Sequence, residues 1–280
     1  MLSRADVQPV QVLDAQLGRF LPVEAYQPVG VLGVSNLAEL SGNRLLVATQ
    51  DGIGIVQHRS LARLGPMDLQ DVHEVTLGDG TVLVADAAQD VVVVLDERDL
   101  AVVERLHPPT PGTFHLNQAL AHCNQLLAVV HDVRGRARRG RNGLVVHHDG
   151  GVIDLRTGAA LIHGLRAPHS LRRVDDGWIL IDSGHRRLQI LDDAWMPRGE
   201  VELPGWGRGL ARDEATGAIH VGISPPRPRY QRALGWKVQR HPSVVQIDLA
   251  TMSVANTIQV DHAEQINGVH LVTSDLLDLD

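Results

Sequence analysis

The chain has 280 residues, 26 of them basic and 33 acidic, with a formal net charge of −7 and a pI near 6.1. An acidic chain with only 3% aromatic residues disfavours nucleic-acid binding, which depends on a high positive charge and on side chains that stack on bases. No run approaches the roughly 18 apolar residues of a membrane span, and the first ten residues carry charges in place of an apolar signal segment, so we expect a cytoplasmic protein without membrane association.

A polar side chain recurs six times just ahead of an apolar stretch that is typical of a buried strand. The positions follow one another at steps of 37 to 59 residues: Asn36, His73, His115, His169, Arg208 and Asn267. Repeats of about 40 to 50 residues are typical of β-propeller blades, which are four-stranded sheets stacked around an axis. Equivalent positions then face one another across a central channel, so these residues are expected to form a polar ring.

The strands within a blade follow from turn residues and apolar runs. In the blade that begins at His73, a turn at 78–80 precedes predicted strands at 82–85 and 91–95. The near-continuous apolar run at 91–95 indicates a strand covered on both faces. The 27 glycines and 14 prolines suit many short strands joined by turns, so residues 1–280 are expected to form one all-β domain.

The last blade is expected to be composite. After Asn267 the chain supplies one short apolar run and an acidic tail, too little for four strands, whereas apolar segments at 10–13 and 20–23 precede the first ring position. N-terminal strands that complete the C-terminal blade would remove the open sheet edges. The sequence therefore favours six blades over the alternative of five.

Two insertions, at residues 132–143 and 224–243, each separate the second strand of a blade from the third. In a propeller that connection emerges on the face where the innermost strand begins, so both are expected to overhang the ring as lids. The two insertions hold ten of the 26 basic residues. The rest of the chain therefore has only 16 basic residues, whereas the whole chain has 33 acidic residues. A basic rim favours a negatively charged ligand, although runs of like charge are often merely solvated loops. The expected substrate contacts are Arg134, Arg136, Arg227 and Arg229 in the insertions, Trp206 and Tyr230 near them, and Asn36 and Asn267 in the ring.

Three histidines in one ring allow two kinds of chemistry. As neutral imidazoles, His73, His115 and His169 would suit a divalent transition metal such as zinc, iron, copper or nickel, with an open position for water or substrate. They would also suit general acid–base catalysis near neutral pH. Carboxylates that orient these imidazoles are expected at the ends of the second strands: Asp86, Asp132 and Asp182. The alternative is that each ring residue only hydrogen-bonds within its own blade.

The absence of other motifs narrows the possible cofactors, and the single cysteine limits disulfide bonding. No phosphate loop, dinucleotide fingerprint or helical zinc motif occurs, so no nucleotide cofactor is expected. The single cysteine, Cys123, excludes an internal disulfide and is expected to be a buried thiol.

Several short stretches resemble a group of poorly characterised bacterial propeller proteins without an assigned function, some of them similar to proteins of natural-product gene clusters. The stretches are DVHEV at 71–75, FHLN at 114–117, PHSL at 168–171, IDSG at 181–184, GRGLA at 207–211 and VGIS at 221–224. The resemblance implies a six-bladed propeller with its site around His73, His115, His169 and Arg208. A more distant similarity is to lactonase and strictosidine-synthase propellers, but this chain lacks their acidic metal ligands at the ring positions, which disfavours a calcium-type oxygen cage.

Two classes of function follow. The first is an enzyme that acts on a small anionic metabolite or biosynthetic intermediate by lyase, isomerase, cyclase or hydrolase chemistry, with Arg208 stabilising a carboxylate or a developing oxyanion. The second is a non-catalytic propeller that binds a protein or ligand through its basic top face. The fold alone does not decide between them.

Overall fold

The structure is a computed structural model. It describes residues 12–14, 19–21, 34–40, 44–49, 52–57, 60–66, 68–137, 139–140, 143–144, 149–226, 231, 241–260 and 265–271. Among these residues no helix is long and apolar enough to cross a membrane.

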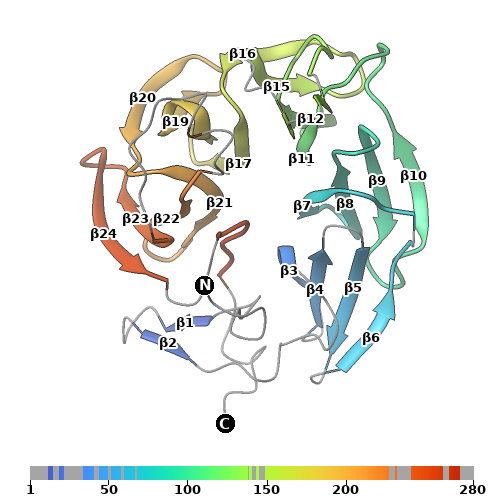
Figure 1. The fold of residues 1–280 in the computed structure, drawn as a ribbon, viewed down its shortest axis with the longest axis horizontal. Helices are drawn as coiled ribbons and strands as arrows, with labels where there is room; N and C mark the ends of the chain where they lie inside the picture. Colours follow the sequence, from blue (N-terminus) through green and yellow to red (C-terminus); the bar gives the residue numbers. More distant parts are fainter. Residues whose placement is uncertain are drawn as a thin grey trace.

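Within the described ranges the chain forms five antiparallel four-stranded sheets arranged around a centre (Figure 1). In chain order, the blades are β3 (Val34–Leu40), β4 (Arg44–Thr49), β5 (Gly52–Gln57) and β6 (Ser60–Leu64); β7 (Val72–Leu77), β8 (Thr81–Asp86), β9 (Val91–Asp96) and β10 (Val102–Leu106); β11 (Leu116–His122), β12 (Gln125–Val130), β15 (Gly150–Asp154) and β16 (Ala160–Leu165); β17 (Pro168–Val174), β18 (Gly177–Asp182), β19 (Arg187–Asp192) and β20 (Pro197–Glu202); and β21 (Trp206–Arg212), β22 (Ile219–Ser224), β23 (Ser243–Asp248) and β24 (Ser253–Gln259). This arrangement confirms the predicted all-β propeller class.

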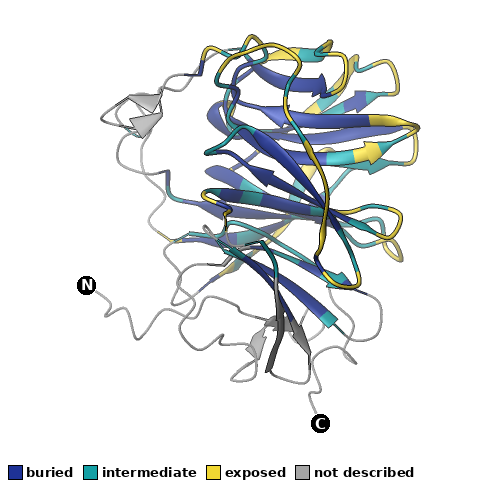
Figure 2. Cartoon of the chain, turned by 90° about the vertical axis from the view of Figure 1, so that its right-hand side faces the viewer, coloured by how far each residue is buried: buried dark blue, intermediate teal, exposed yellow. Residues whose placement is uncertain are grey.

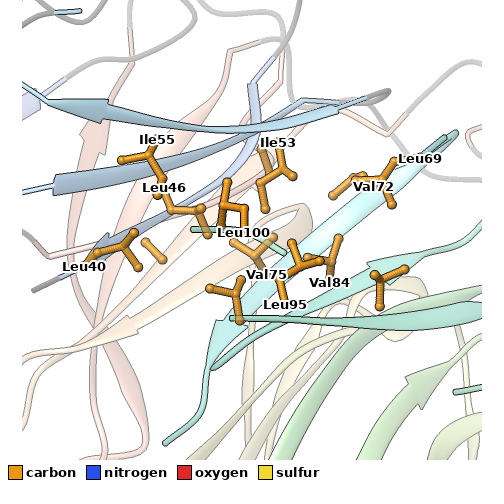
Figure 3. Packing of buried hydrophobic residues seen from close by; sticks show 14 of the residues in the cluster. Leu40, Leu46, Ile53, Ile55, Leu69, Val72, Val75, Val84, Leu95 and Leu100 are labelled. Atoms are coloured by element: carbon orange, nitrogen blue, oxygen red, sulfur yellow. The ribbon is translucent and has the colours of Figure 1, made fainter. Parts of the chain in front are cut away.

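The hydrophobic core lies between the blades. Residues 91–95 of β9 are all buried, as expected for a strand covered on both faces, whereas the outermost strand β10 is largely exposed (Figure 2). Leu46 of the first blade and Leu95 of the second belong to one cluster of buried side chains (Figure 3). Similar clusters join the second blade to the third, the third to the fourth and the fourth to the fifth. The blades are therefore held together by face-to-face apolar packing.

The prediction of six blades is wrong, and the alternative of five is right for the described residues. The fifth blade is built entirely from Trp206–Gln259, and β1 (Val12–Asp14) pairs with β2 (Arg19–Leu21) in a separate two-stranded sheet, so these N-terminal strands do not complete it. Residues 265–271, which contain the sixth ring position, have no strand structure. They lie near the centre, on the side between the fifth blade and the first (Figure 1).

Both insertions fall where they were expected, between the second and third strands of their blades. The first runs from the end of β12 to the start of β15 and contains the small hairpin of β13 (Arg139–Gly140) and β14 (Gly143–Leu144). The third strand of this blade, β15, begins at Gly150. The sequence suggested that it would begin at residue 144, directly after the insertion. The second runs from β22 to β23, and most of its residues lie outside the described ranges.

Cys123 is exposed, which corrects the expectation of a buried thiol. It stands in the two-residue turn between β11 and β12, because His122 pairs with Gln125. Cys123 and Asn124 both have positive φ angles, 46° and 64°, as a tight hairpin turn requires. The turn geometry, and not the hydrophobicity of the thiol, decides its position.

Candidate functional site

Each innermost strand carries an irregularity in its pairing at the ring position. The register of the inner strand against the second strand shifts next to Asn36, across His73, beside Leu116, after His169 and after Arg208. His115, just ahead of its strand, and Ser170 have positive φ angles of 55° and 51°. Bulges of this kind redirect side chains and are over-represented next to functional sites.

The structure brings the three predicted histidines together, with a fourth between them. The ring centroids of His73 and His115 are 4.8 Å apart, those of His115 and His131 are 4.4 Å apart, and those of His131 and His169 are 5.5 Å apart. Trp206 lies at the end of this row, 6.1 Å from the ring of His169. Side chains from the second, third and fourth blades therefore form one continuous cluster, which we call the histidine cluster (His73, His115, His131 and His169), and Trp206 of the fifth blade lies beside it.

His131 was not among the predicted site residues. It follows β12 directly, and its backbone N–H donates to the carbonyls of Phe114, at 3.0 Å, and His115, at 3.3 Å. The signal was present in the sequence, because the second strand of a blade runs back toward the start of the first. A histidine directly after the second strand therefore lies close to the ring residue that precedes the first strand.

Burial sets the protonation state of the inner part of the cluster. His131 is 3% exposed and His169 is 5% exposed. Burial lowers the pKa of His131 well below 6.5, and His115, His169, His73 and Arg208 add to the shift. Burial also lowers the pKa of His169 well below 6.5, with Arg208 as the next cause. Both imidazoles are therefore neutral at pH 7.

The tautomer of His169 follows from its neighbours. Ser183 Oγ–H donates to the carbonyl oxygen of Gly207 at 2.7 Å. A hydroxyl has a single proton, so the contact of 2.8 Å between Ser183 Oγ and His169 Nδ1 has Nδ1–H as its donor. The other ring nitrogen, Nε2, is buried and has no hydrogen-bond partner. In the neutral ring, Nε2 carries the lone pair.

Arg208 and both asparagines also lie at the ring. Arg208 Nη1 donates to Asn267 Oδ1 at 3.0 Å, and Asn36 Nδ2 lies 3.4 Å from the position that a Cβ on Gly268 would take. Residues 265–271 are fixed to the fifth blade by Ser224 Oγ, which accepts from Ile266 N at 2.8 Å. They reach the first blade through His270 Nε2, which accepts from Leu37 N at 3.3 Å. The segment thus connects the two blades across the ring.

A second polar layer follows the ring along the inner strands. Glu74, next to His73, is 6% exposed and pairs with Arg172 at 2.7 Å. Ser170, next to His169, donates a hydrogen bond to Glu74 at 3.1 Å. Beyond this layer lies a hollow of about 340 Å³, lined by apolar side chains and by Glu39, Thr76, Gln118, Arg172, Arg173 and His270. The ring residues themselves do not line it. The Glu74–Arg172 pair therefore lies between the histidine cluster and the hollow.

Two of the three carboxylates predicted behind the histidines, those of Asp86 and Asp182, bind other partners. Asp86 accepts from the backbone N–H groups of residues 70, 71, 88 and 89, and Asp182 accepts from Arg166 N and pairs with His185 and Arg187. Asp132 accepts from Arg134 N at 2.9 Å. The carboxylate nearest to His73 is Asp71, whose Oδ1 is 3.5 Å from Nε2. Asp86 and Asp182 thus organise loops, since buried carboxylates satisfy the exposed N–H groups of a turn.

The basic residues of the insertions are described in part. Arg134 and Arg136 are exposed but lie 3.0 Å and 3.4 Å from Asp149 Oδ2, which offsets much of their charge. Arg227, Arg229 and Tyr230 lie outside the described residues. Trp206 is 4% exposed.

The metal hypothesis can be tested against the geometry of the side chains. Within the part of the chain that the structure describes, no group of three or more His, Cys, Asp or Glu side chains is arranged to hold a metal ion. His131 and His169 are neutral imidazoles, the form that binds transition metals, but the described residues do not present a preformed three-donor set.

Fold and site define the class as a β-propeller with a polar cluster at its axis. The chain belongs to the family described as a domain of unknown function (DUF4915), which matches residues 70–275. No curated protein matches it significantly. Among solved structures, a protein of unknown function from Bacteroides caccae is 13% identical with a TM-score of 0.61, over 90% of this chain and 89% of the other.

Two further structures are less similar. The computationally designed Ika8 protein is 14% identical with a TM-score of 0.47, over 83% of this chain and 63% of the other. The WD40 β-propeller domain of Doa1 is 11% identical with a TM-score of 0.48, over 68% of this chain and 60% of the other. The chain thus spans less than two thirds of either structure.

Proposed function

We propose that the axis of the propeller is an enzyme site for a small anionic metabolite, in which the histidine cluster exchanges protons and Arg208 binds the negative charge. The observation that carries this proposal is the contact of four histidines from three blades beside one partly buried guanidinium. Clusters of titratable groups with shifted pKa values occur preferentially at functional sites. The reaction classes that fit are lyase, isomerase and cyclase chemistry, which begin with proton transfer, and hydrolysis.

The electrostatics of the cluster favour an anion. Arg208 contributes to the lowered pKa of both His131 and His169. An anion bound beside Arg208 would offset that charge and return His169 toward the pH range in which an imidazole exchanges protons. We extend the proposal to a biosynthetic intermediate as the substrate, on the resemblance of the short sequence stretches to proteins of natural-product gene clusters. The two insertions, as lids, would exclude water.

A transition metal held by His73, His115 and His169 is the second form of the proposal. It requires the side chains to move into a three-donor arrangement, because the described residues do not present one. We therefore assign the proton transfers to the imidazoles. Elemental analysis of protein purified without a histidine tag separates the two forms, since a stoichiometric metal that is lost in His115→Ala supports the metal form.

Binding of anions can be measured by thermal unfolding with acetate, propionate, succinate and phosphate. At a concentration of about ten times its dissociation constant a bound anion stabilises the fold by about 1.4 kcal/mol. We expect at least one probe to stabilise the wild-type protein and to lose this effect in Arg208→Gln. The matched control is Arg212→Gln on the same strand, which removes an ion pair with Asp175 and should retain it. An equal loss in both variants, or no stabilisation by any probe, would contradict the proposal.

Catalysis can be separated from binding by proton NMR in D₂O. An enzyme that moves protons should exchange a carbon-bound hydrogen of a bound carboxylate for deuterium, and His169→Gln should abolish the exchange. Binding without exchange would favour the non-catalytic module.

A further inference from the structure

From the hydrogen bonds around His169 we infer that the site takes a hydroxyl-bearing anion, whose O–H donates to His169 Nε2 while its negative group pairs with Arg208. The inference rests on the proposed function and adds the substrate class. It also gives Ser183 a role, as the residue that fixes which nitrogen of His169 faces the ligand.

The first step is the direction of the hydrogen bonds. Gly207 accepts the proton of Ser183, so the hydroxyl oxygen is left as an acceptor for Nδ1–H of His169. Ser183 is fully buried, so water does not compete for either bond. The same bonds exclude Ser183 as a nucleophile activated by His169, because its proton points to a carbonyl and not to the imidazole.

One hydrogen-bond acceptor of His169 remains unsatisfied. His169 Nε2 is a buried acceptor with no partner in the protein, and such an atom is unfavourable unless a ligand or water supplies a donor. A carboxylate has no proton to give at neutral pH, so a carboxylate alone does not satisfy Nε2. An alcohol next to that group does.

The third step is the position of the cation. Arg208 directly follows Gly207, whose carbonyl accepts from the Ser183 hydroxyl that contacts His169, and Arg208 is also the largest charged contribution to the lowered pKa of His169. Its Nη1 donates to Asn267 Oδ1 at 3.0 Å, and the planar fork of a guanidinium matches the geometry of a carboxylate. A hydroxy acid carries a group for each partner, a negative charge for Arg208 and an O–H for Nε2, whereas a simple carboxylate carries only the first.

The tautomer can be tested without any ligand. Long-range ¹H–¹⁵N spectra of ¹⁵N-histidine-labelled full-length protein, with His169 assigned by its absence in His169→Gln, report which nitrogen carries the proton. We expect Nδ1–H in the wild type and in the control Ser243→Ala, which removes another buried serine of the neighbouring blade. Ser183→Ala should populate Nε2–H. A wild-type His169 protonated at Nε2 would overturn the inference even if Ser183→Ala does not fold.

The substrate class can be tested with lactate and propionate, which differ by one hydroxyl. Titrations followed at the His169 nitrogens should give a dissociation constant about tenfold lower for lactate, the effect of one added hydrogen bond, and Ser183→Ala should reduce the ratio. Equal affinities, both lost in Arg208→Gln, would overturn the hydroxyl requirement and leave the proposed anion site standing. No change at His169 with either compound at saturating concentration would overturn both.

Discussion

His131 and His169 are imidazoles that the fold keeps neutral by burial. Their environment differs from that of a surface histidine, because the charged form would lose its hydration and face Arg208. The same environment makes the cluster a poor place for an added proton unless an anion arrives with it. We therefore regard the lowered pKa values as part of a site that awaits an anionic ligand.

The lowered pKa values predict how stability depends on pH. In the unfolded chain each imidazole binds a proton below about pH 6.5, but the folded protein does not bind it there. Stability is therefore complete above that pH and falls as the pH drops below it, by up to about 1.4 kcal/mol per pH unit for each histidine. Guanidinium unfolding between pH 7 and pH 5 measures this slope, and His131→Gln should make it shallower. An unchanged slope would mean that His131 charges freely in the folded protein.

At the scale of elements, the inner strands and residues 265–271 determine which side chains reach the axis. Gly209 of β21 has a φ angle of 69°, and a Cβ there would lie 2.5 Å from Val269 N. The close approach places Asn267 beside Arg208. The pairing irregularities of the inner strands direct the ring histidines toward the axis, because an ordinary strand would turn alternate residues away from the channel.

Gly209→Ala should release residues 265–271 from the fifth blade. The matched control is Gly217→Ala, since Gly217 has a similar φ angle of 73° but nothing within 4 Å of its Cβ position. Both substitutions should cost about 1–2 kcal/mol of backbone strain, but only Gly209→Ala should speed hydrogen exchange of the Ile266 amide, by about tenfold or more. Equal exchange in the two variants would contradict the packing argument.

At the scale of the whole molecule, the sequence predicts individual strands well but does not predict how many blades close the propeller. The strand at 91–95 was predictable because apolar runs and turn residues act locally. The blade count was not, because Asn267 reaches the ring on a segment without strand structure, and spacing alone does not separate such a segment from the first strand of a blade. The proximity of His73, His115 and His169 followed from the repeat. The partners of Asp86 and Asp182 did not, since neighbouring loops compete for a carboxylate.

The central claim is that the axis binds an anion. Crystals soaked in bromide and measured at its absorption edge test it most directly, because bromide is small, carries only charge and is located by its anomalous signal. We expect a bromide at the ring beside Arg208, and none there in crystals of Arg208→Gln. Bromide bound only at exposed arginines such as Arg134 and Arg136, with none at the ring, would contradict it.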